Sequence, residues 1–166
     1  MPGRQYVTLS KQQAMIGGAL IGRDSVPNFK DTTLTNAQIL ALRATPITLA
    51  PAPGTGVFRE FIRAVLVCKA AAGAYTETAD NLVIRQTNTT GVILSQAIET
   101  TGWLDQAAIK ATNALAKVDT IGALQAKALV LHNSGDGEFG GGNAANTMFV
   151  RCYFIDHSLA SVGVLA

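Results

Sequence analysis

Covalent chemistry in this chain would have to start from one of its two cysteines or from a serine, with a histidine as base. Nucleophilic catalysis requires the nucleophile, the histidine and a carboxylate within hydrogen-bonding reach of one another. Cys152 precedes Asp156 and His157 by only four and five positions. In the strand that we predict there, such a separation corresponds to about 13–17 Å along the chain. The sequence therefore predicts no nucleophilic site and no enzyme.

The only two histidines, His132 and His157, lie at the far ends of two predicted strands, residues 128–132 and 147–155. We expect these strands to form a hairpin around the glycine-rich segment between them, which would bring the two imidazoles close together. Two histidines without a third ligand make a poor metal site. Ordinary hydrogen bonds are therefore expected for both.

The segment Gly135–Gly140, with the sequence GDGEFG, matches the G-x-G-x-x-G pattern of dinucleotide-binding sites. That pattern binds a pyrophosphate only where a strand leads through it into a helix, and here a strand follows. Asp136 and Glu138 offer oxygens for calcium, together with Asn133, but the complete calcium-loop pattern is absent. A flexible turn is the preferred interpretation, and no cofactor or metal is expected.

Cys68 and Cys152 each occur in a strand-like context and are expected to be small buried apolar side chains. A disulfide between them would require their strands to be neighbours. The apolar run Ala14–Ile21 is short and contains two glycines, so no secretion signal is predicted. No apolar run reaches the roughly 18 residues of a membrane helix. We expect a soluble protein made in a reducing cytoplasm, with no membrane partner.

Charged residues make up only 14% of the 166 residues, whereas the hydrophobic share of 48% is ordinary. A monomer with so few charges has difficulty covering its surface, so this composition favours a subunit of an oligomer or assembly. The net charge is +2, and no cluster of basic residues suited to a row of phosphates is present. Nucleic acid is not an expected partner.

The central stretch runs from Thr45 to Lys69, where two prolines and two glycines separate a short β-like run, residues 45–49, from a long apolar run. We predict that this long run, residues 57–69, is a buried strand; its apolar spacing also fits a helix. A short helix over residues 36–42 is predicted after Thr35, which would cap it. Further strands are predicted over residues 81–86, 91–94, 128–132 and 147–155, with 81–86 and 91–94 forming a hairpin.

Residues 95–124 are the least strand-like part, and short helices or a long excursion between strands both fit them. Repeated short strands with proline and glycine turns predict an all-β fold, a jelly-roll-like β-sandwich with short helices in its connections. The domain is expected to span residues 34–166, and residues 1–33 are expected to form an extended N-terminal arm. That arm is either a flexible tail, an extra strand laid on the domain, or a segment that orders by adding to a neighbouring subunit.

Candidate contact residues for a subunit or partner come mainly from this arm. The lone tryptophan is added because its neighbours suggest a loop, although a core position is the more usual one for such a residue. The candidates are Tyr6, Val7, Leu9, Arg23, Phe29 and Trp103.

A resemblance to a family is carried by several motifs in the same order along the chain. Residues 34–42 (LTNAQILAL) precede residues 45–56 (TPITLAPAPGTG), with Ala74-Tyr75-Thr76, residues 127–131 (KALVL) and residues 150–153 (VRCY) further on. This arrangement resembles a group of small virion proteins of tailed bacteriophages. The motifs are features of turns and core rather than a catalytic signature, so no functional residues are carried over.

The resemblance implies a jelly-roll sandwich in a virion, on the outside of the capsid. It implies a decoration or cement protein, commonly a homotrimer, whose partners are the major capsid protein and other copies of itself. The alternative is a tail or baseplate component, with receptor binding as its role. The arm and the 95–124 excursion depart from the family pattern.

Overall fold

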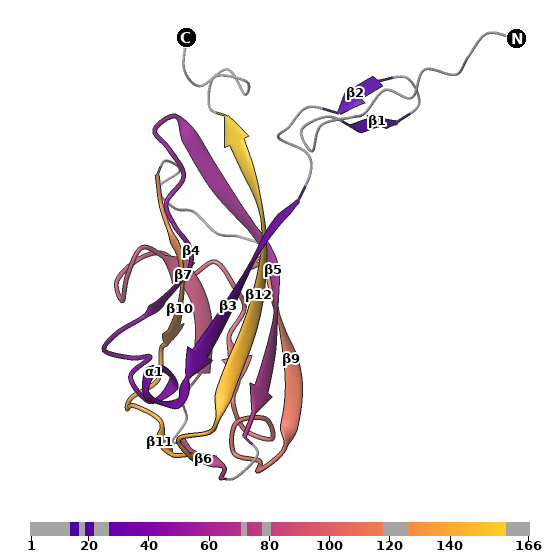
Figure 1. The fold of residues 1–166 in the computed structure, drawn as a ribbon. Coiled ribbons are helices and arrows are strands. Elements are labelled where there is room, and N and C mark those ends of the chain that lie inside the picture. Colours follow the sequence, from indigo (N-terminus) through magenta and orange to yellow (C-terminus); the bar gives the residue numbers. More distant parts are fainter. Residues whose placement is uncertain are drawn as a thin grey trace, which may run out of the picture.

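The computed structural model describes residues 27–70, 73–77, 81–117 and 126–158, together with the strands β1 (Ala14–Ile16) and β2 (Ala19–Ile21), which pair with each other. The predicted all-β sandwich is confirmed (Figure 1). Its elements are β3 (Asn28–Thr35), α1 (Asn36–Leu40), β4 (Ile47–Ala50), β5 (Val57–Lys69), β6 (Tyr75–Thr76), β7 (Asn81–Gln86), β8 (Ile98–Glu99), β9 (Ile109–Leu115), β10 (Leu129–Asn133), β11 (Gly140–Gly141) and β12 (Thr147–Ser158).

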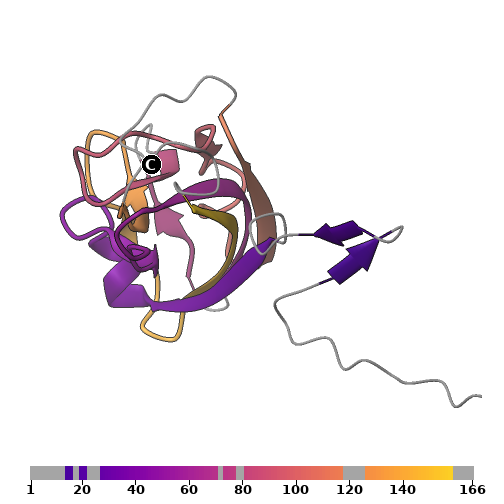
Figure 2. The same ribbon diagram turned by 90° about the horizontal axis from the view of Figure 1, so that it is seen from above.

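Two four-stranded antiparallel sheets form the sandwich, with the strand orders β3-β12-β5-β9 and β4-β10-β7-β8. We call them the first and the second sheet. The chain crosses between the sheets after β3, β4, β5, β8, β9 and β10, so strands adjacent in one sheet are mostly distant in sequence (Figures 1 and 2). The last strand, β12, lies between β3 and β5. This order is that of a jelly roll.

Burial alternates along the long strands because successive side chains point to opposite faces of a sheet. In β5 the inward side chains are Ala64, Leu66 and Cys68, which are fully buried. They pack with inward residues of β12 and with the second sheet in one hydrophobic core. The predicted strand over residues 57–69 is therefore confirmed with the predicted bounds.

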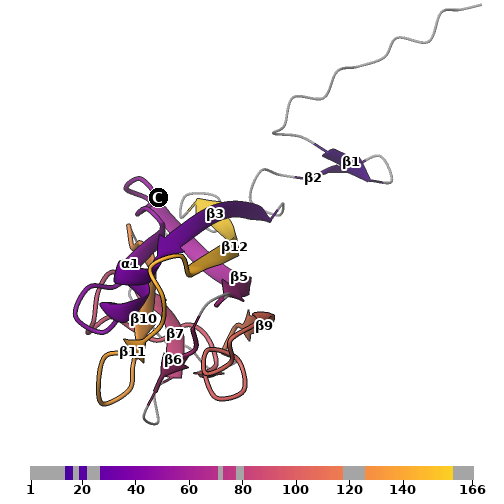
Figure 3. The same ribbon diagram turned by 60° about the horizontal axis from the view of Figure 1, so that its bottom comes forward.

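One end of the sandwich carries α1, β6 and β11 (Figure 3). As predicted, Thr35 caps α1, and Gln38 completes a capping box with it. Two backbone N–H groups beyond the helix, those of Arg43 and Ala44, donate to the Glu138 carboxylate at 2.9 and 2.7 Å. Glu138, which the sequence suggested as an oxygen donor for calcium, therefore braces the loop that follows α1.

The glycine-rich segment leads into β11 and then β12, so no helix follows it. This agrees with the interpretation as a turn. Within the part of the chain that the structure describes, no three His, Cys, Asp or Glu side chains form a group suited to a metal ion. Among the same residues, no helix is long and apolar enough to cross a membrane.

The hairpin predicted from residues 128–132 and 147–155 is wrong. Both segments are strands, but β10 pairs with β4 and β7 in the second sheet, whereas β12 pairs with β3 and β5 in the first. The glycine-rich connection is long enough to pass from one sheet to the other, and sequence proximity then says nothing about pairing.

Two other expectations change. Residues 91–94 return beside β7 through a single bridge, Arg85 to Ile93, instead of a full partner strand. In the 95–124 region, where short helices or a long excursion were expected, the edge strand β9 occupies residues 109–115.

The domain begins closer to the N-terminus than predicted. Residues 28–33, assigned to the arm, belong to β3, which pairs with β12 from Asn28 to Thr35 and forms an edge of the first sheet. The expectation of an arm over the remaining residues falls almost wholly outside the described part of the chain.

Candidate functional site

The outward surface of the first sheet is the most apolar exposed feature of the sandwich. Here we call it the outer face, and it is made of the side chains that point away from the core. Among the described residues, the three exposed large hydrophobic side chains are all on it: Phe29 (57% exposed), Ile109 (66%) and Leu115 (52%). The other members are Asp31, Thr33, Thr35, Arg63, Val65, Val67, Lys69, Ala111, Asn113, Thr147, Phe149, Arg151 and Tyr153.

Arginines and aromatic rings alternate across the strands of this face. The Arg63 guanidinium lies 4.3 Å from the ring centre of Tyr153, and Arg151 lies 4.7 Å from that of Phe29. Phe29 and Tyr153 contact each other with ring centres 6.0 Å apart. Cation–π contacts of this kind hold the arginines flat against the sheet. The result is a surface on which apolar side chains alternate with arginines that lie over aromatic rings.

Two of the charged side chains on this face are paired with each other. Arg151 forms a two-pronged ion pair with Asp31 on β3, at 2.7 Å for each hydrogen bond. This hydrogen bonding lowers the pKa of Asp31. Arg63 has no ion-pair partner among the described residues. Lys69, opposite Ile109 at the other end of the face, likewise has no ion pair among these residues. A partner docking on this face would therefore meet apolar side chains and two available cations, Arg63 and Lys69.

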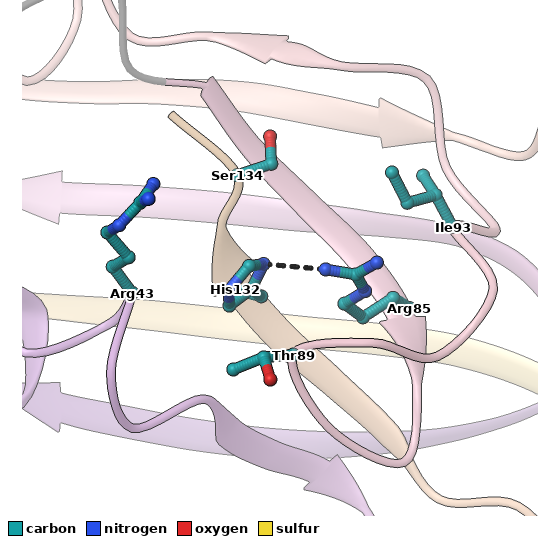
Figure 4. A pocket seen from close by; sticks show the side chains of 6 residues that line it. All are labelled: Arg43, Arg85, Thr89, Ile93, His132 and Ser134. Carbon is teal, nitrogen blue, oxygen red and sulfur yellow. Dashed lines mark hydrogen bonds between the residues drawn. The ribbon is translucent and has the colours of Figure 1, made fainter. Parts of the chain in front are cut away.

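The second sheet carries a different feature, a pocket of about 400 Å³ on the side away from the core (Figure 4). Arg85 on β7 and His132 on β10 share this side of the sheet, since Ile84 and Leu131 next to them point into the core. The Arg85 Nη1 group lies 3.1 Å from His132 Nδ1. The pocket is lined by Arg43, Arg85, Thr89, Ile93, His132 and Ser134.

Comparison with known proteins leaves the chain without an assigned family. No protein-family model matches it, and no curated protein is significantly similar to it. Among solved structures, the chain is similar to one titled "Capsid of Ralstonia phage GP4". The two share 16% sequence identity, the match covers 78% of this chain and 82% of the other, and the TM-score is 0.45. A similarity of this size assigns neither a function nor a partner to the chain.

The structure describes two of the six contact residues predicted from the sequence, Phe29 and Trp103. Phe29 lies on the outer face and is exposed, as a contact residue must be. Trp103 is only 5% exposed and its indole N–H donates to the Lys110 carbonyl, so it is a core residue and not a surface anchor. Tyr6, Val7, Leu9 and Arg23 lie outside the described residues.

Sequence reasoning missed most of the outer face and all of the pocket. The outer-face residues come from four strands, and only their period-two spacing within each strand was available as a signal. The pocket joins a loop, β7 and β10, and its residues are scattered over about 90 positions of the sequence.

The two histidines lie on different sheets. His132 contacts Arg85, whereas His157 lies 2.8 Å from Glu60 and its ring stacks on Phe58 at 4.5 Å. They are therefore not neighbours, and the expectation that a hairpin would bring them together is wrong.

The two cysteines lie on neighbouring strands but out of register. Cys152 is opposite Ala64, and Cys68 is opposite Met148, four residues further along. Four residues correspond to about 13 Å, too far for a disulfide. Both thiols are free and fully buried. Burial raises the pKa of Cys68 to about 11 and that of Cys152 to about 12.

We expect neither cysteine to react with a thiol reagent such as DTNB at pH 8 in the folded protein, and both to react in 8 M urea. Burial blocks access, and the raised pKa keeps the reactive thiolate scarce. The raised pKa values also link the stability of the protein to pH. The two buried thiols contribute fully to the free energy of unfolding below the unfolded pKa of about 9, and this contribution is lost as the pH rises above that value. Urea unfolding at pH 8, 9, 10 and 11 should show that loss. Rapid labelling of the native protein would contradict the placement of both thiols.

Proposed function

We propose that the chain is a structural protein of a tailed-bacteriophage virion that binds and stabilises the capsid from outside, as a decoration or cement protein. The observation that carries the proposal is the outer face, where exposed apolar side chains lie beside arginines that contact aromatic rings. Large exposed apolar patches on soluble domains mark interaction sites. The low overall charge supports the same conclusion.

The partners in this proposal are the major capsid protein and other copies of the chain, with a trimer as the favoured assembly. A trimer offers three outer faces to a lattice of repeated subunits, and simultaneous contacts multiply modest affinities. No catalysis is part of this role. The N-terminal residues, proposed as an arm, would add contacts to a neighbouring subunit.

The first test is the composition and structure of the virus particles made by the genome that encodes the chain. The proposal expects stoichiometric copies at repeated symmetry positions on the head in electron microscopy. A few copies at one vertex, or on the tail, would instead support the second candidate, a tail or baseplate component. Absence from the particle overturns both.

The second test is a prediction about the outer face itself. Ile109→Asp together with Leu115→Asp places two charges on the exposed edge strand β9 and should abolish binding to capsids that lack the protein, measured by co-sedimentation. Both side chains are more than half exposed, so we expect the fold and its unfolding midpoint to change little.

Ala144→Asp together with Ala145→Asp is the matched control, because it adds the same two charges at exposed loop positions outside the outer face. The control should bind capsids like the unaltered chain. Full binding by the double variant would exclude β9 from the interface, and equal loss in the control would show an effect of charge alone.

A further inference from the structure

We propose that the pocket on the second sheet binds a small oxyanion, either a phosphate group or a carboxylate group. The site lies on the sheet opposite the outer face and is independent of the role proposed in a virion. Two guanidinium groups, those of Arg43 and Arg85, line the site with the Thr89 hydroxyl at its margin (Figure 4). The Ser134 hydroxyl, also at the margin, donates to the Asn81 carbonyl at 3.0 Å.

Arg85 is the fixed element of the site. Its Nε group donates to the Gly91 carbonyl at 2.9 Å, and its Nη1 group contacts His132 Nδ1 at 3.1 Å. A guanidinium has five N–H donors, so these two contacts leave further donors available. Within the described ranges Arg85 has no carboxylate in ion-pair contact. A half-buried cation without a counter-charge is unfavourable, and an anion in the pocket would supply that charge.

Arg43 supplies the second cation from the loop after α1. The backbone of that loop is held in place by Glu138, whose carboxylate accepts hydrogen bonds from the N–H groups of Arg43 and Ala44. Since this carboxylate is engaged by the backbone, the Arg43 side chain remains without an ion-pair partner among the described residues. The two guanidinium groups line the pocket on either side of His132 (Figure 4). Guanidinium groups are typical protein ligands of phosphate and carboxylate.

His132 contributes as a neutral group. Its pKa is lowered by burial first and then by the positive charge of Arg85, while a backbone hydrogen bond with Arg43 and the charge of Glu138 act in the opposite direction. The neutral imidazole accepts from Arg85 and orients it. Protonation would turn Nδ1 into a donor that faces the Arg85 guanidinium and would remove this hydrogen bond, so the site requires the neutral imidazole.

The volume of about 400 Å³ exceeds that of a single phosphate ion and lies within the range of small-molecule sites. The pocket is open at the surface side of the sheet, where Thr89 and Ser134 are exposed. It can therefore take a free anion or the anionic group of a larger small molecule.

The test is an NMR titration of the full ¹⁵N- and ¹³C-labelled chain with sodium phosphate and, separately, sodium acetate. Sodium chloride at matched ionic strength is the blank. We expect saturable shifts confined to the signals of the pocket residues, with a millimolar or tighter dissociation constant. These residues are Arg43, Arg85, Thr89, Ile93, His132 and Ser134. Saturation by phosphate, by acetate or by both identifies the anionic group.

Arg85→Met and Arg43→Met should each weaken binding by about tenfold or more, as expected for loss of a charge-assisted hydrogen bond. Arg43 is in a loop, so its variant tests the site even if Arg85→Met fails to fold. Arg63→Met on the outer face removes the same charge and should bind normally. Shifts that do not saturate, shifts that chloride reproduces, or equal weakening in Arg63→Met would overturn the site.

Discussion

Arg59→Met is expected to lower the free energy of unfolding by about 2–3 kcal/mol, because it leaves a partly buried carboxylate without its partner. Arg59 on β5 forms a two-pronged ion pair with Asp156 on β12, at 2.6 and 2.7 Å. Its side chain is 9% exposed and that of Asp156 is 31% exposed. It also donates to the Pro51 carbonyl beyond β4 and lies 4.0 Å from the ring centre of Phe154. One side chain thus connects both sheets over the end of the core.

Urea unfolding of Arg59→Met and Arg151→Met provides a matched comparison, since both arginines form two-pronged pairs with an aspartate on a neighbouring strand. The Arg151–Asp31 pair is more exposed, so its loss should have a smaller effect that is screened by salt. The effect of Arg59→Met should persist in 0.5 M salt. Equal effects of the two substitutions would show that burial of the Arg59 pair does not matter.

Gly91→Ala is expected to destabilise the fold by about 3 kcal/mol, because the added methyl group has no room. A Cβ at this position would lie 1.6 Å from the Gln86 carbonyl oxygen. The backbone here is held by the hydrogen bond from Gln86 N–H to the Val92 carbonyl, and the Gly91 carbonyl accepts from Arg85. The turn must therefore move, at a cost of the size seen for overpacked sites.

Gly54→Ala is the control for Gly91→Ala, since no atom lies within 4 Å of a Cβ at Gly54. There the substitution should be neutral or stabilising by up to about 1 kcal/mol, through the lower entropy of the unfolded chain. Gly91→Ala should also weaken anion binding in the pocket, because the Gly91 carbonyl that accepts a hydrogen bond from Arg85 would shift. An unfolding midpoint equal to that of Gly54→Ala would contradict the close packing of this turn.

Local elements were predictable where local signals agreed. The strands at residues 57–69 and 81–86 have the predicted bounds because β-branched and apolar residues fill them and turn residues flank them. Thr35 at the start of α1 was predictable from its short-range hydrogen bonds alone. In β9 the local signal was weak: short helices and a long excursion both fitted residues 95–124, and pairing with β5 stabilises a strand there.

Pairing between distant segments was not predictable from the sequence. Two well-predicted strands were joined into a hairpin that does not exist, because a strand's residues specify which face is buried but not which neighbour it has. The same limit applies to Trp103, whose surrounding glycine and threonines suggested a loop. Its loop folds over the core, and its indole N–H finds an acceptor at Lys110.

The sequence by itself determined the class of the fold, the positions of most strands and turns, and a composition too poor in charge for an ordinary isolated surface. These properties depend on residues close together in the chain. Only the tertiary structure decided that Arg43, Arg85 and His132 share a pocket, that Phe29 and Ile109 share a face, and that the two cysteines lie out of register. These relations arise from long-range antiparallel pairing, in which the crossover connections select the partners of each strand, and no local pattern encodes that selection.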